Sequence, residues 1–179
     1  DTCVKLVELL HKNRTAHAHA NTASVLCSTM GMFAMRSASA HKSLRAADAE
    51  EHVLAELLFW NERHKRLTKA ASGAAAPPSS PPAVTPLSTI VWALDKLVAH
   101  GVGAGPLPRV APAYVAAARS VLLRMLEESA NPVVMLNASN VLVRWTASAR
   151  TTAKQAGAPA LVASEEGARV CFALTEVLK

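Results

Sequence analysis

The sequence predicts an all-α protein in which antiparallel helical hairpins stack as an α-solenoid-like array. Three observations support this fold class. Alanine, leucine and valine supply most of the apolar residues, whereas aromatic residues make up only 4% of the chain. Alanine is the best helix former, and long strand-like runs of β-branched and aromatic residues are almost absent. Apolar residues recur at helical spacing, and the short connections between these segments favour antiparallel neighbours.

The N-terminal part is predicted to contain three helices. Residues 2–12 form a short helix with apolar side chains three and four positions apart, and residues 13–20 form a connection. A second helix is expected to start at Asn21 or Thr22, which are good N-caps, and to end near Arg36. The third helix should cover residues 44–69, with acidic residues in its first half and basic residues at its end, as the helix dipole favours.

Residues 70–86 differ in composition, because alanine, glycine, serine and five prolines dominate them. This composition predicts a flexible or polyproline-like linker. The linker divides the chain into an N-terminal helical unit, residues 1–69, and a C-terminal helical-repeat unit, residues 87–179. The two units can also pack together as one domain.

The C-terminal part is predicted to contain four helices. Thr85 and Pro86 form a favoured helix start, and Gly101 ends that helix. The next helix begins at Pro112 and stops before the Asn131-Pro132 dipeptide. The last two helices are expected at residues 133–155 and from Ser164 onward.

The charge and the cysteines limit the possible environments. The net charge is +6 and is spread over both halves of the chain. This charge fits weak attraction to a polyanion such as RNA, and it equally fits an ordinary protein surface that is basic. No run of about 18 apolar residues occurs, so we expect no membrane span, and no signal peptide is visible. Cys3, Cys27 and Cys171 have no metal-ligand spacing and fit reduced thiols in an intracellular or organelle-matrix compartment.

No motif predicts an enzyme. His17 and His19, with His11 and His41 nearby, lack a carboxylate or cysteine at ligand spacing, so a solvated basic loop is expected rather than a metal site. Phosphate-binding glycine loops and a nucleophile elbow are absent. We therefore expect no catalytic residues, no cofactor and no small-molecule substrate.

The densest basic cluster follows a tryptophan near the end of the third predicted helix. Phosphate contacts by cations together with base stacking on an indole form a reasonable RNA-binding arrangement. The alternative is a helix C-terminus that simply favours cations. The candidate RNA-binding residues are Trp60, Arg63, Lys65, Arg66 and Lys69.

Two segments share a tryptophan followed by small and apolar residues. They are Ser-Thr-Ile-Val-Trp-Ala-Leu-Asp-Lys-Leu at 88–97 and Asn-Val-Leu-Val-Arg-Trp-Thr-Ala-Ser-Ala at 140–149. They resemble the helical repeats of organellar RNA-binding proteins of the octotricopeptide and RAP-domain families, including FAST-kinase-like proteins. A weaker resemblance connects Lys-Gln-Ala-Gly-Ala-Pro-Ala-Leu-Val at 154–162 to the junction between armadillo repeats.

The first resemblance implies mitochondrial or plastid RNA metabolism, and we expect a non-catalytic subunit of an organellar ribonucleoprotein assembly in the mitochondrial matrix. Such an assembly would be a ribosome or an RNA-processing or editing complex, in which the subunit binds RNA and neighbouring proteins. The second resemblance implies the alternative, an armadillo- or HEAT-like protein-protein interaction scaffold that does not bind RNA.

Overall fold

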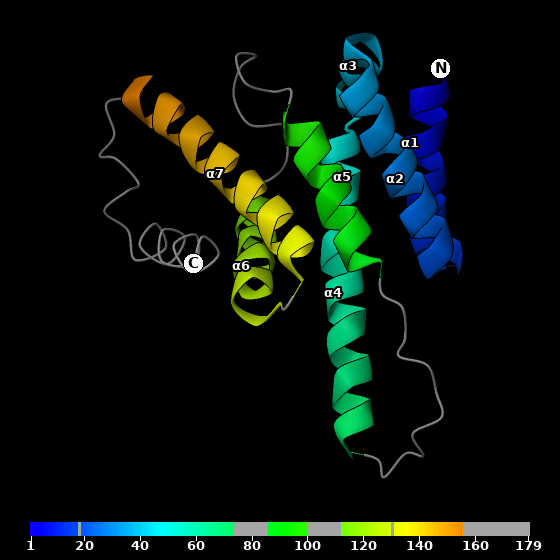
Figure 1. Cartoon of the computed structure of the whole chain (residues 1–179). Helices are drawn as coiled ribbons and strands as arrows, with labels where there is room; N and C mark the ends of the chain where they lie inside the picture. The colour runs from blue at the N-terminus through cyan, green and yellow to red at the C-terminus, as the bar shows by residue number, and fades with distance from the viewer. Residues whose placement is uncertain (18, 74–85, 100–111, 130, 156–179) are drawn as a thin grey trace.

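The computed structural model describes residues 1–17, 19–73, 86–99, 112–129 and 131–155. These residues form seven α-helices, one short π-helical segment and no strand (Figure 1). The predicted all-helical class is therefore confirmed for this part of the chain. The elements are α1 (Thr2–Lys12), η1 (Asn13–His17), α2 (Ala20–Arg36), α3 (Ala38–Ala46), α4 (Ala49–Gly73), α5 (Leu87–Ala99), α6 (Pro112–Glu128) and α7 (Pro132–Gln155).

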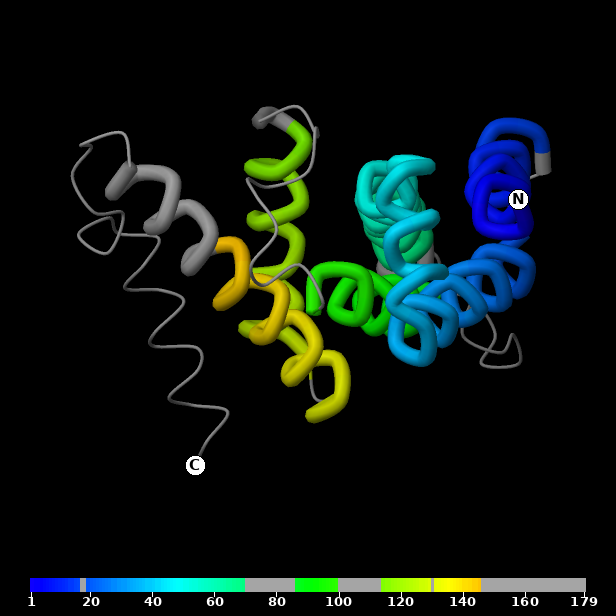
Figure 2. Tube along the Cα trace, turned by 90° about the horizontal axis from the view of Figure 1, so that it is seen from above, coloured from blue at the N-terminus to red at the C-terminus, as the bar shows by residue number. Residues whose placement is uncertain are grey.

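The helices lie in two layers (Figure 2). One layer holds α1, α4 and α6, and the other holds α2, α5 and α7, while α3 leads from α2 to α4. Helix α5 occupies the centre, because it packs against α2, α4 and α7. Contacts between α1 and α2, between α4 and α5, and between α6 and α7 join the two layers.

Local polar side chains fix several helix starts. The Asp1 carboxylate accepts a hydrogen bond from the Cys3 amide at 2.9 Å, and the Asn131 side chain accepts one from the Val133 amide at 3.0 Å. Such bonds satisfy amides that have no partner within the helix. The predicted N-cap of the second helix is wrong, since α2 starts at Ala20 without a side-chain cap. Instead, the Asn13 side chain bonds both backbone groups of His19 at 3.2 and 3.3 Å.

The predicted single helix at residues 44–69 is two helices. Ser37 caps α3 by accepting a hydrogen bond from the Ala40 amide, and the chain breaks at Ala47 and Asp48 before α4 begins. Asp48 has a φ of 54°, a left-handed conformation that ends a helix and that aspartate tolerates better than most residues. Helix α4 also continues to Gly73, so the first residues of the predicted linker are helical.

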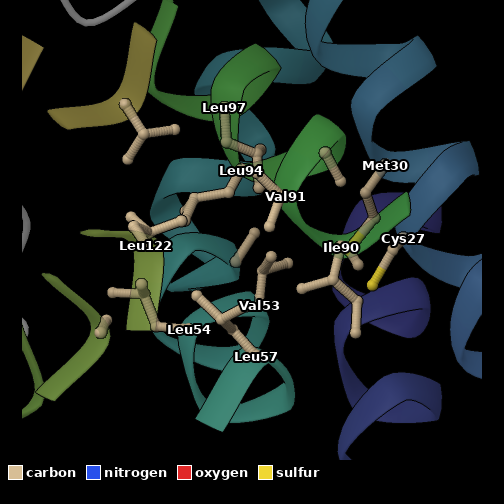
Figure 3. Close-up of a cluster of buried hydrophobic side chains, with 14 of the residues drawn as sticks. Cys27, Met30, Val53, Leu54, Leu57, Ile90, Val91, Leu94, Leu97 and Leu122 are labelled. Atoms are coloured by element: carbon tan, nitrogen blue, oxygen red, sulfur yellow. The ribbon is translucent and has the colours of Figure 1, made fainter. Parts of the chain in front are cut away.

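The core lies between the two layers and includes side chains from both sides of the predicted linker. Leucine, valine and isoleucine side chains of α4 and α5 meet Cys27 and Met30 of α2 (Figure 3). Trp145 is buried on α7, and Trp92 of α5 packs against Gly31 of α2. Among the described helices, none has both the length and the hydropathy needed to cross a membrane.

Some sequence predictions lie outside the described residues. These are the linker between α4 and α5, the helix from Ser164 onward, Cys171 and most of the armadillo-like segment. The other two cysteines, Cys3 and Cys27, are free and buried.

Candidate nucleic-acid interface

The four predicted basic residues all lie on the second half of α4, and all are exposed. Arg63 and Arg66 are three residues apart and therefore share a helix face. Lys65 donates a hydrogen bond to Glu62 Oε1 at 2.8 Å on the exposed surface. The structure thus presents Arg63, Lys65, Arg66 and Lys69 to solvent along one helix.

Trp60 does not fit the stacking role that the sequence predicted. Its side chain is only 3% exposed, and its Nε1 donates a hydrogen bond to Glu56 Oε2 at 2.9 Å. A buried indole cannot offer its face to a nucleotide base. The Arg63 guanidinium lies 5.2 Å from the centre of the Trp60 ring, so Trp60 instead holds this cation by a cation–π contact.

A groove of about 610 Å³ runs beside these arginines, between η1, α4 and α6. Two rows of α4 side chains at four-residue spacing form most of its wall, and the rest comes from one residue of η1 and one of α6. The lining residues are Arg14, Ala55, Leu58, Phe59, Glu62, Arg63, Arg66 and Tyr114.

A buried carboxylate lies next to the groove. Glu56 is fully buried, and its Oε1 lies 3.5 Å from Nε of Arg14, which lines the groove. Burial raises the pKa of Glu56 to about 7, although the Trp60 hydrogen bond and the Arg14 charge lower it in part. When Glu56 is ionised it neutralises Arg14, so the remaining groove cations are Arg63 and Arg66, of which Arg66 interacts with Glu62.

Glu62 brings one negative charge to the groove. Its hydrogen bond with Lys65 and the Lys65 charge lower the pKa of Glu62, so this carboxylate is ionised at neutral pH. Nearby, Arg124 of α6 donates a hydrogen bond to the buried Asn61 side chain of α4 and lies 3.6 Å from Glu128. The contact between Arg124 and Asn61 joins α6 to α4.

No protein-family model, curated protein or solved structure matches this chain.

The solvated basic loop expected around the histidines is wrong in part, because residues 13–17 form η1 and His41 is buried. His41 is buried and its Nε2 lies 2.7 Å from the Leu97 carbonyl oxygen, while the His11 ring packs edge-on against His52 at 5.5 Å. In the described part of the chain, no three His, Cys, Asp or Glu side chains are grouped closely enough to hold a metal ion.

Sequence reasoning missed four charged or aromatic groove residues, namely Arg14, Phe59, Glu62 and Tyr114. Phe59 was detectable, because it lies four residues before Arg63 and so on the same side of the helix. No sequence signal connected Arg14 and Tyr114 to α4, since they come from other elements that only the fold brings close.

Proposed function

We propose that this protein is a non-catalytic helical-repeat subunit of an organellar ribonucleoprotein assembly, and that it binds RNA through the second half of α4. The observation that carries the proposal is the pairing of Arg63 and Arg66, both exposed, along a groove that also has aromatic side chains. Arginine recognises phosphate oxygens in a bidentate manner, and exposed cations on one face attract a polyanion.

The surrounding charges support this reading. Lys65 and Lys69 extend the row of exposed cations beyond the groove, and Glu62 is the acidic residue among the lining side chains. Glu62 is paired with Lys65 and also interacts with Arg66, and the groove still has more cationic than acidic lining residues. The whole chain is also basic, with a net charge of +6.

The architecture supports a subunit built from repeated helix pairs. We propose that the pairs α1 with α2, α4 with α5 and α6 with α7, which contact each other across the two layers, are the repeats of a short α-solenoid. A location in the mitochondrial matrix, in a ribosome or an RNA-processing or editing complex, rests on the resemblance of residues 88–97 and 140–149 to octotricopeptide-type repeats.

The salt dependence of RNA binding tests the proposal. Each phosphate contact steepens the slope of log affinity against log salt by about 0.7 for single strands. The triple variant Arg63→Gln, Arg66→Gln, Lys69→Gln should therefore flatten the slope by roughly two units for a mixed-sequence RNA oligonucleotide. Circular dichroism should show an unchanged helix content, because all three side chains are exposed.

A charge-matched control separates this surface from general basicity. Lys5→Gln, Arg36→Gln, Lys42→Gln removes three cations from exposed positions that do not line the groove. This control should leave the slope close to that of the wild type. Equal slopes for both triple variants, or no RNA binding at low salt, would overturn the proposal.

The second candidate function is a protein-protein interaction scaffold of armadillo or HEAT type. It is favoured by Val133, Leu136 and Val143, which are 60%, 56% and 47% exposed and lie on one face of α7. An exposed apolar stripe on an outer helix suits a neighbouring protein surface. If RNA binding is absent while partner proteins co-purify with the chain and are lost in Leu136→Lys, this candidate takes precedence.

A further inference from the structure

We infer that the groove between η1, α4 and α6 takes one nucleotide of a single-stranded RNA, and that it favours a base with an exocyclic amino group, such as cytosine, over uracil. This inference rests on the proposed RNA binding and names the form of RNA that this site would recognise. Its basis is the combination of aromatic, cationic and acidic side chains that line the groove.

The groove has the size and the charge for such a ligand. Its volume of about 610 Å³ lies within the range of about 300–1,000 Å³ that small-ligand sites occupy. Arg63 and Arg66 lie one turn apart on α4, and consecutive phosphates of an extended strand can follow such a pair. Arg63 is already held over the Trp60 ring, which reduces the conformational entropy that it would lose on binding.

The aromatic residues favour a single strand over a duplex. Tyr114 is 44% exposed and Phe59 is partly buried, and both line the groove. Base-aromatic stacking requires a base that has left its helical stack, which single strands provide and duplexes do not. Phe59 is fixed by an edge-to-face contact with Trp60 at 5.3 Å, so it forms a rigid part of the wall.

Glu62 supplies the preference between bases. An ionised carboxylate only accepts hydrogen bonds, and the amino group of cytosine donates one, whereas uracil presents a carbonyl oxygen at the same position. The Lys65 hydrogen bond holds the Glu62 carboxylate in its ionised form and leaves lone pairs for a base. Uracil would place two acceptors against each other.

The first experiment measures binding of the 179-residue chain to oligocytidylate of about 15 nucleotides and to an RNA duplex of the same length. Tyr114→Ala should weaken binding to the single strand about tenfold, as expected for one lost stacking contact, with little effect on the duplex. Tyr114→Phe keeps the ring and should bind like the wild type. Because Tyr114 is exposed, neither change should unfold the chain, which circular dichroism checks.

The second experiment compares oligocytidylate with oligouridylate, two pyrimidine strands that differ in their hydrogen-bonding edge. The wild type should prefer cytidylate about fivefold, and Glu62→Gln should abolish the preference, because an amide both donates and accepts. Cytidine monophosphate should compete with the strand only weakly, since it lacks the neighbouring phosphates. A mononucleotide that binds as tightly as the strand would assign the groove to a free nucleotide and overturn the inference.

The two proposals fail in different ways. If neither oligonucleotide binds, the proposed RNA function itself is wrong. If RNA binds with a slope that depends on Arg63 and Arg66, but Tyr114→Ala and Glu62→Gln change nothing, then the basic face binds RNA and the nucleotide site in the groove does not exist. Equal affinity for single strand and duplex would also overturn the inference.

Discussion

The interface between α2 and α5 and the groove between α4 and α6 are built on different physical principles. In the first region, small side chains of α2 let the two helices approach closely, and Trp92 of α5 lies directly on Gly31. The buried partners are apolar residues such as Met30 and Ile90 (Figure 3). In the second region, charged and polar groups join the elements, through Arg14 with Glu56 and Arg124 with Asn61.

The difference shows which region tolerates change. Close packing of apolar groups is insensitive to pH and salt but responds strongly to a change of volume. Charged contacts respond to protonation, and a buried ion such as Glu56 costs free energy unless it is well paired. The α2–α5 interface is therefore suited to hold the fold, whereas the groove is suited to respond to a charged ligand.

The largest expected effect concerns Glu56. The folded protein raises the pKa of Glu56 from 4.5 to about 7, so its contribution to stability is full below about pH 4.5 and is lost as the pH rises through about 7. Glu56→Gln removes this loss while keeping an acceptor for Trp60 Nε1. Relative to the wild type, the variant should gain up to about 3 kcal/mol in unfolding free energy between about pH 4.5 and pH 8.

Urea unfolding across this pH range measures the effect. His52 has a pKa lowered by burial and by the charges of His11 and Arg14, and it therefore contributes with the opposite sign. The contribution of His52 is common to the wild type and to Glu56→Gln, so it cancels in the difference between their unfolding free energies. Burial also raises the pKa of Glu50, which lies away from the groove, to about 7. The variant Glu50→Gln should therefore show a similar pH dependence. A pH-independent difference for Glu56→Gln would contradict the account of the groove.

A smaller effect is expected at Gly31. A Cβ there would lie 2.4 Å from Cζ3 of Trp92, so Gly31→Ala must displace a ring within a packed interface. We expect a net loss of about 1–2 kcal/mol in unfolding free energy, because overpacking outweighs the higher helix propensity of alanine.

A double-mutant cycle isolates the cause. In the Trp92→Leu background, where the ring is gone, Gly31→Ala should be neutral or stabilising, which gives a coupling of at least about 1 kcal/mol. Thermal and urea unfolding supply the four values. If Gly31→Ala stabilises the wild-type protein, the α2–α5 interface is not limited by close packing, and the contrast with the groove disappears.

The smallest effect is expected at Arg124, which joins α6 to α4. Arg124→Ala removes the donor to the Asn61 side chain, which is only 3% exposed, and should cost about 1 kcal/mol. Arg36→Ala, at an exposed position on α2, should change the unfolding free energy by less than about 0.5 kcal/mol. Equal values for the two variants would show that the Arg124 contact does not stabilise the packing of α6 on α4.

The sequence by itself determined the helical class and most helix ends. Proline at positions 112 and 132 marks the starts of α6 and α7, and the end of α2 at Arg36 was also predicted. These features follow from local rules, because helix hydrogen bonds join residues four apart and caps act within one turn. The exposed cations of α4 were likewise visible, and the three-residue spacing of Arg63 and Arg66 places these two on one face of the helix.

Only the tertiary structure decided the break at Asp48, the burial of Trp60 and the composition of the groove. Asp48 adopts its left-handed conformation where the chain turns from α3 into α4. No local sequence signal at this position indicates that the helical pattern of apolar residues is interrupted. Trp60 is buried because it packs into the hydrophobic core, and the Glu56 carboxyl group one turn earlier accepts the hydrogen bond that its N–H group needs there. Arg14 and Tyr114 are 100 positions apart in the sequence, and they line one groove because of how η1 and α6 pack beside α4, which depends on contacts that no helical pattern encodes.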